Sequence, residues 1–92
     1  MSDVRAHVLV SGHVHGVFFR GQTQRRANTH GVAGWVRNLP NGQVEAVFEG
    51  DETKVRDMVA WCRQGPPNAL VTGVDVRYEP YTGAFLSFSV RY

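Results

Sequence analysis

The sequence predicts an α+β fold in which two helices pack on one face of an antiparallel sheet, with residues 1–92 forming a single domain. This prediction rests on the order of the elements and on the length of the chain. Segments with apolar residues at every second position alternate with two helical segments in the order β-α-β-β-α-β, and one additional strand follows. A chain of 92 residues has room for one hydrophobic core.

The first part of the chain is expected to form a strand, a loop and a helix. Apolar residues occupy alternate positions of the first strand, at Val4, Ala6, Val8 and Val10. Residues 12–19 interrupt this pattern and predict a loop. Residues 20–30 contain no proline and several good helix formers, so they predict a helix that Gly31 ends. The apolar stripe of this helix is thin and consists of Phe19, Thr23 and Ala27.

A hairpin and a second helix are expected next. Residues 32–38 and 43–50 are rich in β-formers, and the turn residues Pro-Asn-Gly at 40–42 join them. Asp51 is predicted to cap the second helix. The apolar stripe of that helix has the spacing i, i+3, i+4 and i+7, at Val55, Met58, Val59 and Cys62. Gly-Pro-Pro at 65–67 is expected to stop it.

Two more strands are predicted at about 69–79 and 84–91. The first has one face formed by Val74, Val76 and Tyr78, and the second has one face formed by Leu86, Phe88 and Val90. This order of elements is that of the ferredoxin-like sandwich. Because that fold serves binding, regulatory and catalytic domains alike, it does not identify a function.

The composition limits the classes of function. The net charge of +2 is spread along the chain, so it does not indicate a nucleic-acid partner. Cys62 is the only cysteine, which excludes an internal disulfide and a metal cage of thiolates. The N-terminus does not resemble a signal peptide, and no apolar run approaches the roughly 20 residues of a membrane span. We therefore expect a cytoplasmic protein without a membrane partner.

Residues 11–20, SGHVHGVFFR, raise the possibility of a metal site. His13 and His15 form an H-x-H pair, but no further ligand has suitable spacing, so no metal is predicted. A cysteine nucleophile is not predicted either. Cys62 belongs to the apolar stripe of the second helix, where a buried structural thiol is the expected role.

The same stretch is better explained as an anion-binding loop, with a plain structural turn as the alternative. A loop that joins a strand to a helix presents backbone N–H groups, and the helix N-terminus adds partial positive charge. Gly12 and Gly16 allow the backbone to curl. Arg20 at the start of the helix can bind a phosphate through two hydrogen bonds. A cation is unfavourable at a helix N-terminus, so its presence there is more readily understood if an anion binds beside it.

Asn38 is a second candidate, at the end of the predicted strand 32–38. Its structural interpretation is a turn former ahead of residues 40–42. Its functional interpretation is an amide that holds a water molecule beside the anion.

Both segments resemble the signatures of a known family. Residues 10–20, VSGHVHGVFFR, resemble the first signature of the acylphosphatases, and residues 34–50, GWVRNLPNGQVEAVFEG, resemble the second. Gly-Pro-Pro after the second helix and the ending Val-Arg-Tyr are also similar to that family. The resemblance covers nearly the whole chain, and two signatures at the right separation are far more specific than one glycine-rich loop.

The resemblance implies hydrolysis of the carboxyl–phosphate bond of small acyl phosphates to a carboxylate and inorganic phosphate, without a metal or a cofactor. It implies that Arg20 and Asn38 are catalytic, with Asn38 orienting the attacking water. It also implies that the phosphoryl group binds to the loop of His15, Gly16, Val17, Phe18, Phe19 and Arg20. A free-standing, monomeric enzyme is expected, because the chain ends at Tyr92 and nothing in the sequence requires an oligomer.

The chain departs from the family pattern at two positions. His15 stands where the family usually has glutamine, and Phe18 stands where it often has glycine. If residue 15 contributes only its backbone, the exchange is harmless. If its side chain matters, His15 introduces a pH dependence near its ordinary pKa of about 6.5.

Two other functions are compatible with the same order of elements. An RNA-binding module would carry stacking aromatic residues on its third strand, but residues 43–50, QVEAVFEG, contain two glutamates and one aromatic residue. A regulatory domain that binds phosphate or carboxylate without turnover is the other alternative. The sequence leaves open which acyl phosphate is the physiological substrate and whether the carboxylate of Tyr92 folds back toward an arginine.

Overall fold

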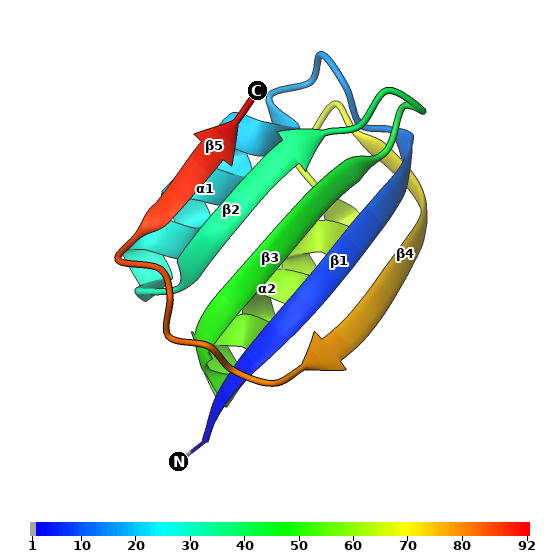
Figure 1. Cartoon of the computed structure of the whole chain (residues 1–92). Coiled ribbons are helices and arrows are strands. Elements are labelled where there is room, and N and C mark those ends of the chain that lie inside the picture. Colours follow the sequence, from blue (N-terminus) through cyan, green and yellow to red (C-terminus); the bar gives the residue numbers. More distant parts are fainter. Residues whose placement is uncertain (1) are drawn as a thin grey trace.

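The computed structural model describes residues 2–92 and confirms the α+β sandwich. Two helices cover one face of a five-stranded sheet (Figure 1). The elements in chain order are β1 (Asp3–His13), α1 (Phe19–His30), β2 (Ala33–Asn38), β3 (Val44–Asp51), α2 (Glu52–Gln64), β4 (Leu70–Glu79) and β5 (Phe88–Arg91). No helix within residues 2–92 has the length and apolar character needed to cross a membrane.

The strands lie in the order β4-β1-β3-β2-β5. β1 pairs antiparallel with both β3 and β4, and β2 pairs antiparallel with β3, as the ferredoxin-like prediction requires. β5, the additional strand, pairs parallel with β2, so the five-stranded sheet is mixed. The physical reason is the connection from β4, which crosses the sheet to its other edge before β5 begins (Figure 1).

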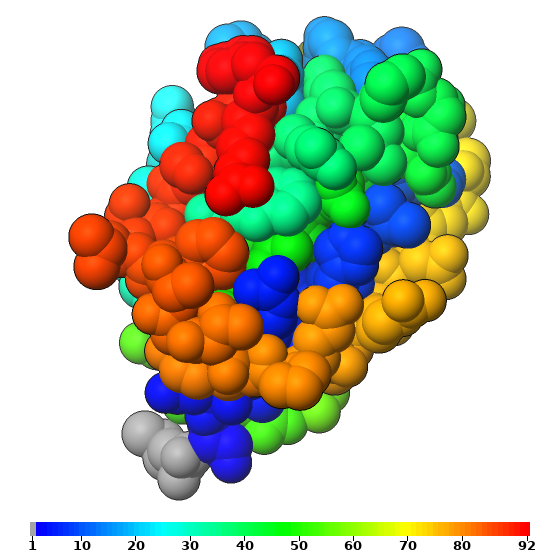
Figure 2. Space-filling model, in the orientation of Figure 1, coloured from blue at the N-terminus to red at the C-terminus, as the bar shows by residue number. Residues whose placement is uncertain are grey.

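The connection is formed by residues 80–87, which we call the crossing segment. It lies over the face of the sheet that the helices leave open (Figure 2). The strand predicted at 84–91 is therefore shorter than expected, and Leu86, predicted on the same face as Phe88 and Val90, lies outside the strand and is fully exposed. Chain that crosses a sheet cannot pair with it, so the regular strand begins only at Phe88.

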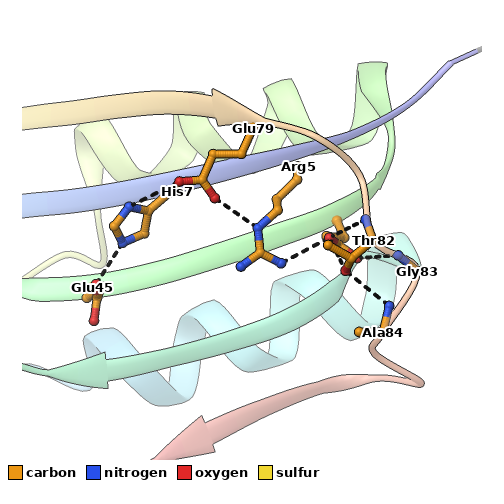
Figure 3. A network of polar contacts seen from close by, with 8 residues as sticks. Arg5, His7, Glu45, Glu79, Thr82, Gly83 and Ala84 are labelled. Atoms are coloured by element: carbon orange, nitrogen blue, oxygen red, sulfur yellow. Dashed lines mark hydrogen bonds and ion pairs between the residues drawn. The ribbon is translucent and has the colours of Figure 1, made fainter.

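Glu49 of β3 holds the crossing segment to the sheet. Its carboxylate is 2% exposed and accepts hydrogen bonds from the Thr82 amide at 3.0 Å, the Thr82 hydroxyl at 2.8 Å and the Gly83 amide at 3.1 Å. Arg5 of β1 adds an ion pair at 3.0 Å and also binds Glu79 (Figure 3). Burial opposes ionisation, but the donors from Thr82, Arg5 and Gly83 outweigh it and lower the pKa of the Glu49 carboxyl below its ordinary value.

The core lies between the sheet and the helices, where the predicted patterns are confirmed. The alternate residues Ala6, Val8 and Val10 of β1 are buried. The predicted stripes of α1 and α2 are also buried, at Phe19, Thr23, Ala27, Val55, Met58, Val59 and Cys62. The Thr23 hydroxyl donates to the Phe19 carbonyl at 2.7 Å, so a polar residue is tolerated in the stripe. Asp51 caps α2 by accepting from the Lys54 amide, and Gly31 ends α1, as predicted.

Three strands end at the same end of the sheet. β1 and β2 both run antiparallel to β3, and β5 runs parallel to β2, so all three point in one direction. The loop after β1, the hairpin after β2 and the C-terminus after β5 consequently lie together, at the top of Figure 1. The fold thereby brings the predicted anion-binding loop to the same place as Asn38.

Candidate active site

A break in the β1–β4 pairing directs the chain from β1 into the loop. The register shifts between Ser11 and Gly12, where β1 contains a bulge, and the strand ends at His13, two residues into the predicted loop. Gly12 has φ +125°, and a Cβ atom there would lie 2.0 Å from the carbonyl oxygen of Leu70. Only glycine can occupy this position, so Gly12 fixes the path by which the loop leaves the sheet.

The loop presents a series of free backbone donors. The N–H groups of residues 15–20 donate no hydrogen bond to any of residues 2–92. No side chain caps the N-terminus of α1, and its first turn contains no acidic residue. Because unpaired N–H groups at a helix N-terminus carry partial positive charge, this arrangement favours a bound anion.

The conformation of the loop is strained at Phe18. Gly16 and Phe18 have φ angles of 70° and 64°, in the left-handed region. Glycine adopts this region freely, whereas a residue with a side chain is destabilised by about 1–2 kcal/mol. Phe18 is also 81% exposed, so burial of its ring does not offset the strain. Strain at an exposed residue beside free backbone donors is typical of a functional loop.

Arg20 is the second residue of α1 and is half-buried. No carboxylate among residues 2–92 lies within ion-pair distance of its guanidinium, although other arginines, such as Arg5 and Arg37, have such partners. Instead, the guanidinium carbon lies 4.8 Å from the centre of the Tyr92 ring. The ring of the last residue thus holds the arginine through a cation–π contact and leaves its N–H groups available for an anion.

Asn38 is the last residue of β2. Its side-chain oxygen Oδ1 is buried and has no hydrogen-bond partner among residues 2–92. A buried acceptor without a partner is unfavourable by about 1–3 kcal/mol, so such atoms usually serve a ligand or a water molecule.

These groups share one cavity of about 610 Å³. Five of the residues that the sequence selected line it: Gly16, Phe18, Phe19, Arg20 and Asn38. The other lining residues are Val14, Gly21, Gln24, Ser89, Val90 and Tyr92. The sequence missed the contribution of β5, because nothing in its pattern indicates that this strand pairs beside β2.

Two of the predicted loop residues do not line the cavity. Val17 packs against the hydrophobic core. His15 points its ring toward the β2–β3 hairpin, where Nε2 lies 2.8 Å from the carbonyl oxygen of Gln43. For these two residues, the backbone N–H groups are the parts available to an anion.

The titratable side chains limit the chemistry of the site. Burial raises the pKa of the Cys62 thiol to about 12, so this cysteine does not provide a thiolate near neutral pH. Within residues 2–92, no group of three or more His, Cys, Asp or Glu side chains has the arrangement of a metal site. The cavity is lined by one cationic side chain, Arg20, by two amide side chains, Gln24 and Asn38, and by a series of backbone donors.

Comparisons with known proteins agree with this geometry. The model of the family described as Acylphosphatase matches residues 6–90. An acylphosphatase of Syntrophobacter fumaroxidans is 55% identical over 92 residues, which cover 100% of this chain and 95% of the relative. An acylphosphatase of Pelotomaculum thermopropionicum is 51% identical over 92 residues, with 100% of both chains covered.

A solved structure gives the same result. The crystal structure of an acylphosphatase from Bacillus subtilis superimposes with a TM-score of 0.92 at 32% identity. The match covers 97% of this chain and 99% of the other. Sequence and fold thus lead to the same family over nearly the whole length of the chain.

Proposed function

Because this chain belongs to the acylphosphatase family and has its hydrolytic activity on acyl phosphates, we propose that Arg20 and the N–H groups of residues 15–20 bind the phosphoryl group and that Asn38 orients the attacking water. The observation that carries this proposal is the set of free N–H groups beside an unpaired, half-buried arginine. Donors held in place before the substrate arrives need no reorganisation during the reaction.

The phosphoryl oxygens bind where these donors converge. Arg20 closes on two oxygens through its planar fork, and the loop amides donate to the third. Negative charge spread over these oxygens in the transition state is stabilised by the same groups. The Tyr92 ring, which also lines the cavity, lies 4.8 Å from the guanidinium carbon.

The attacking water is held by Asn38. Its free Oδ1 atom accepts one water hydrogen and turns the water oxygen toward phosphorus. The new P–O bond forms as the bond between phosphorus and the carboxylate oxygen breaks, and the carboxylate leaves with the electron pair. Because this leaving group is weakly basic, it needs no proton from a general acid. The water proton passes to a phosphate oxygen or to solvent, since an amide is not a base.

The partners follow from the same site. We propose a small acyl phosphate as substrate and inorganic phosphate as product, with a monomeric, single-domain protein acting in the cytoplasm. We propose no nucleic-acid or membrane partner. The face of the sheet used by RNA-binding modules of this topology carries Glu45 and Glu49 and is covered in part by the crossing segment, which disfavours a polyanion.

Hydrolysis of benzoyl phosphate by purified variants tests the residue roles. Arg20→Ala removes charge-assisted bonds worth about 3 kcal/mol, so kcat/KM is expected to fall at least about 100-fold. Inorganic phosphate should inhibit this variant far more weakly than the wild type. Asn38→Ala is expected to lower kcat by a similar factor while phosphate inhibition is kept.

The matched control is Arg25→Ala, which removes an exposed arginine from the same helix and should leave both parameters unchanged. Undiminished activity in Arg20→Ala would overturn the assignment. Phosphate binding by a wild-type protein that does not hydrolyse benzoyl phosphate would instead indicate a regulatory domain.

A further inference from the structure

One backbone carbonyl joins the phosphate loop to the hairpin that carries Asn38. The oxygen of Gln43 accepts a hydrogen bond from the Leu39 amide at 2.8 Å, and Leu39 directly follows Asn38. His15 Nε2 lies 2.8 Å from the same oxygen. The hairpin and the loop are therefore connected through His15, and this connection lies next to the residue that holds the water.

Gln43 itself is fixed on several sides. Its backbone amide donates to Asn41 Oδ1 at 3.0 Å, and its side-chain oxygen accepts from Asn41 Nδ2 at 2.9 Å. Its side-chain nitrogen donates to Ser11 Oγ on β1 at 2.9 Å. Because these hydrogen bonds hold Gln43 in place, its carbonyl oxygen occupies a fixed position to which the histidine ring can bind.

The contact determines the protonation of one ring nitrogen. A carbonyl oxygen only accepts, so Nε2 must carry a hydrogen whether the imidazole is neutral or charged. His15 thus acts as the N–H donor of this contact. The amide group of a glutamine side chain can make the same donation.

We propose that His15 is a positioning residue, whose side chain sets the place of Asn38 relative to the phosphate loop. This inference rests on the roles proposed above for the loop and for Asn38. The phosphate donors all belong to the loop and the start of α1, so they stay together when the link is lost. Asn38 belongs to the hairpin, and a displacement of about 1 Å there is enough to misplace the water. Loss of the link therefore lowers kcat and leaves phosphate binding in place.

Two variants of similar size separate the donor from the volume of the side chain. Glutamine and methionine have the same unbranched length, but only glutamine can donate to the Gln43 carbonyl. In His15→Met we expect kcat for benzoyl phosphate to fall about tenfold, the effect of one lost hydrogen bond in the transition state. His15→Gln should restore kcat to within about twofold of the wild type. The inhibition constant of inorganic phosphate should stay within about twofold in both variants.

The route of the effect is tested by adding Asn38→Ala. If His15 acts through Asn38, His15→Met causes no further decrease of kcat in the Asn38→Ala background. Urea denaturation of each variant checks that the proteins compared are folded. An equal decrease with and without Asn38 would overturn the inference, as would equal kcat values for the glutamine and methionine variants.

The kinetic outcomes distinguish a failure of the proposed function from a failure of the positioning role of His15. An inactive wild type would overturn the proposed function and this inference together. An active wild type that loses activity in Arg20→Ala, but shows no difference between His15→Gln and His15→Met, would overturn this inference alone.

Discussion

Replacing Glu49 with glutamine tests how the crossing segment is held on the sheet. The wild-type carboxylate accepts three hydrogen bonds on Oε2, from Arg5 and from the amide and hydroxyl of Thr82, and one on Oε1, from the Gly83 amide. The best orientation of a glutamine keeps its oxygen toward Arg5 and Thr82. Its NH₂ group then faces the N–H of Gly83, and the negative charge beside Arg5 is gone.

The magnitude follows from these two losses. A hydrogen bond from Arg5 to a charged acceptor stabilises the fold by about 1.5–3 kcal/mol, compared with no hydrogen bond. The Gly83 N–H left without an acceptor is unfavourable by about 1–3 kcal/mol. Glu49→Gln should therefore lower the free energy of unfolding by about 3 kcal/mol at pH 7. For a domain of this size, this corresponds to a decrease in Tm of about 15 °C.

The effect depends on pH in a defined direction. Because the pKa of Glu49 is lower in the folded protein than in the unfolded chain, its ionised form stabilises the fold above the unfolded pKa of about 4.3. This contribution is lost as the pH falls through the folded pKa. The difference between the wild type and Glu49→Gln should thus be largest near neutral pH and shrink in acid.

Urea denaturation between pH 3 and pH 7 measures both quantities. The control is Glu52→Gln, which alters a solvent-accessible pair with Arg56 on α2 and should leave the free energy of unfolding almost unchanged. A Glu49→Gln variant that is no less stable than this control at pH 7 would contradict the proposed role of Glu49, as would a loss of stability that does not shrink on acidification.

Two other predictions concern the backbone of the loop and the buried thiol. Gly12→Ala should lower the free energy of unfolding by more than about 3 kcal/mol, because the new Cβ meets the Leu70 carbonyl oxygen. Gly16→Ala adds no clash and should lower it by about 1 kcal/mol. Urea denaturation compares the two variants, and equal losses would contradict the requirement for glycine at position 12. Cys62 should react with a thiol reagent at pH 8 only as fast as the protein unfolds, because burial raises the pKa of its thiol to about 12. Rapid labelling of the folded protein would contradict this prediction, because it would show that the thiol is accessible.

Local patterns were sufficient to predict most elements of the fold. Alternation in β1 and the stripe of α2 each depend on one element and one core, so the buried residues could be read directly from their spacing. The crossing segment could not be predicted in this way. It is held by Glu49, 33 residues before Thr82, and a buried carboxylate with distant donors leaves no periodic signal.

In the candidate site, too, residues in continuous segments could be predicted, whereas contacts between distant segments could not. The signatures predicted the loop and Asn38, because these residues lie in short continuous segments. Tyr92 was left open, since its place beside Arg20 depends on the parallel pairing of β5 with β2. The direction of the His15 ring depends on the hairpin that packs beside it, and the spacing of residues along the loop carries no information about that neighbour.

We propose that the N–H groups of residues 15–20, together with Arg20, bind a phosphate group. An NMR titration of the uniformly ¹⁵N-labelled protein with inorganic phosphate tests it most directly, with chloride at equal ionic strength as the control. We expect the amide signals of residues 15–20 to shift and to saturate with phosphate, and the Arg20→Ala variant to require far higher phosphate concentrations. Saturable shifts confined to another surface, or identical titrations of the wild type and Arg20→Ala, would contradict it.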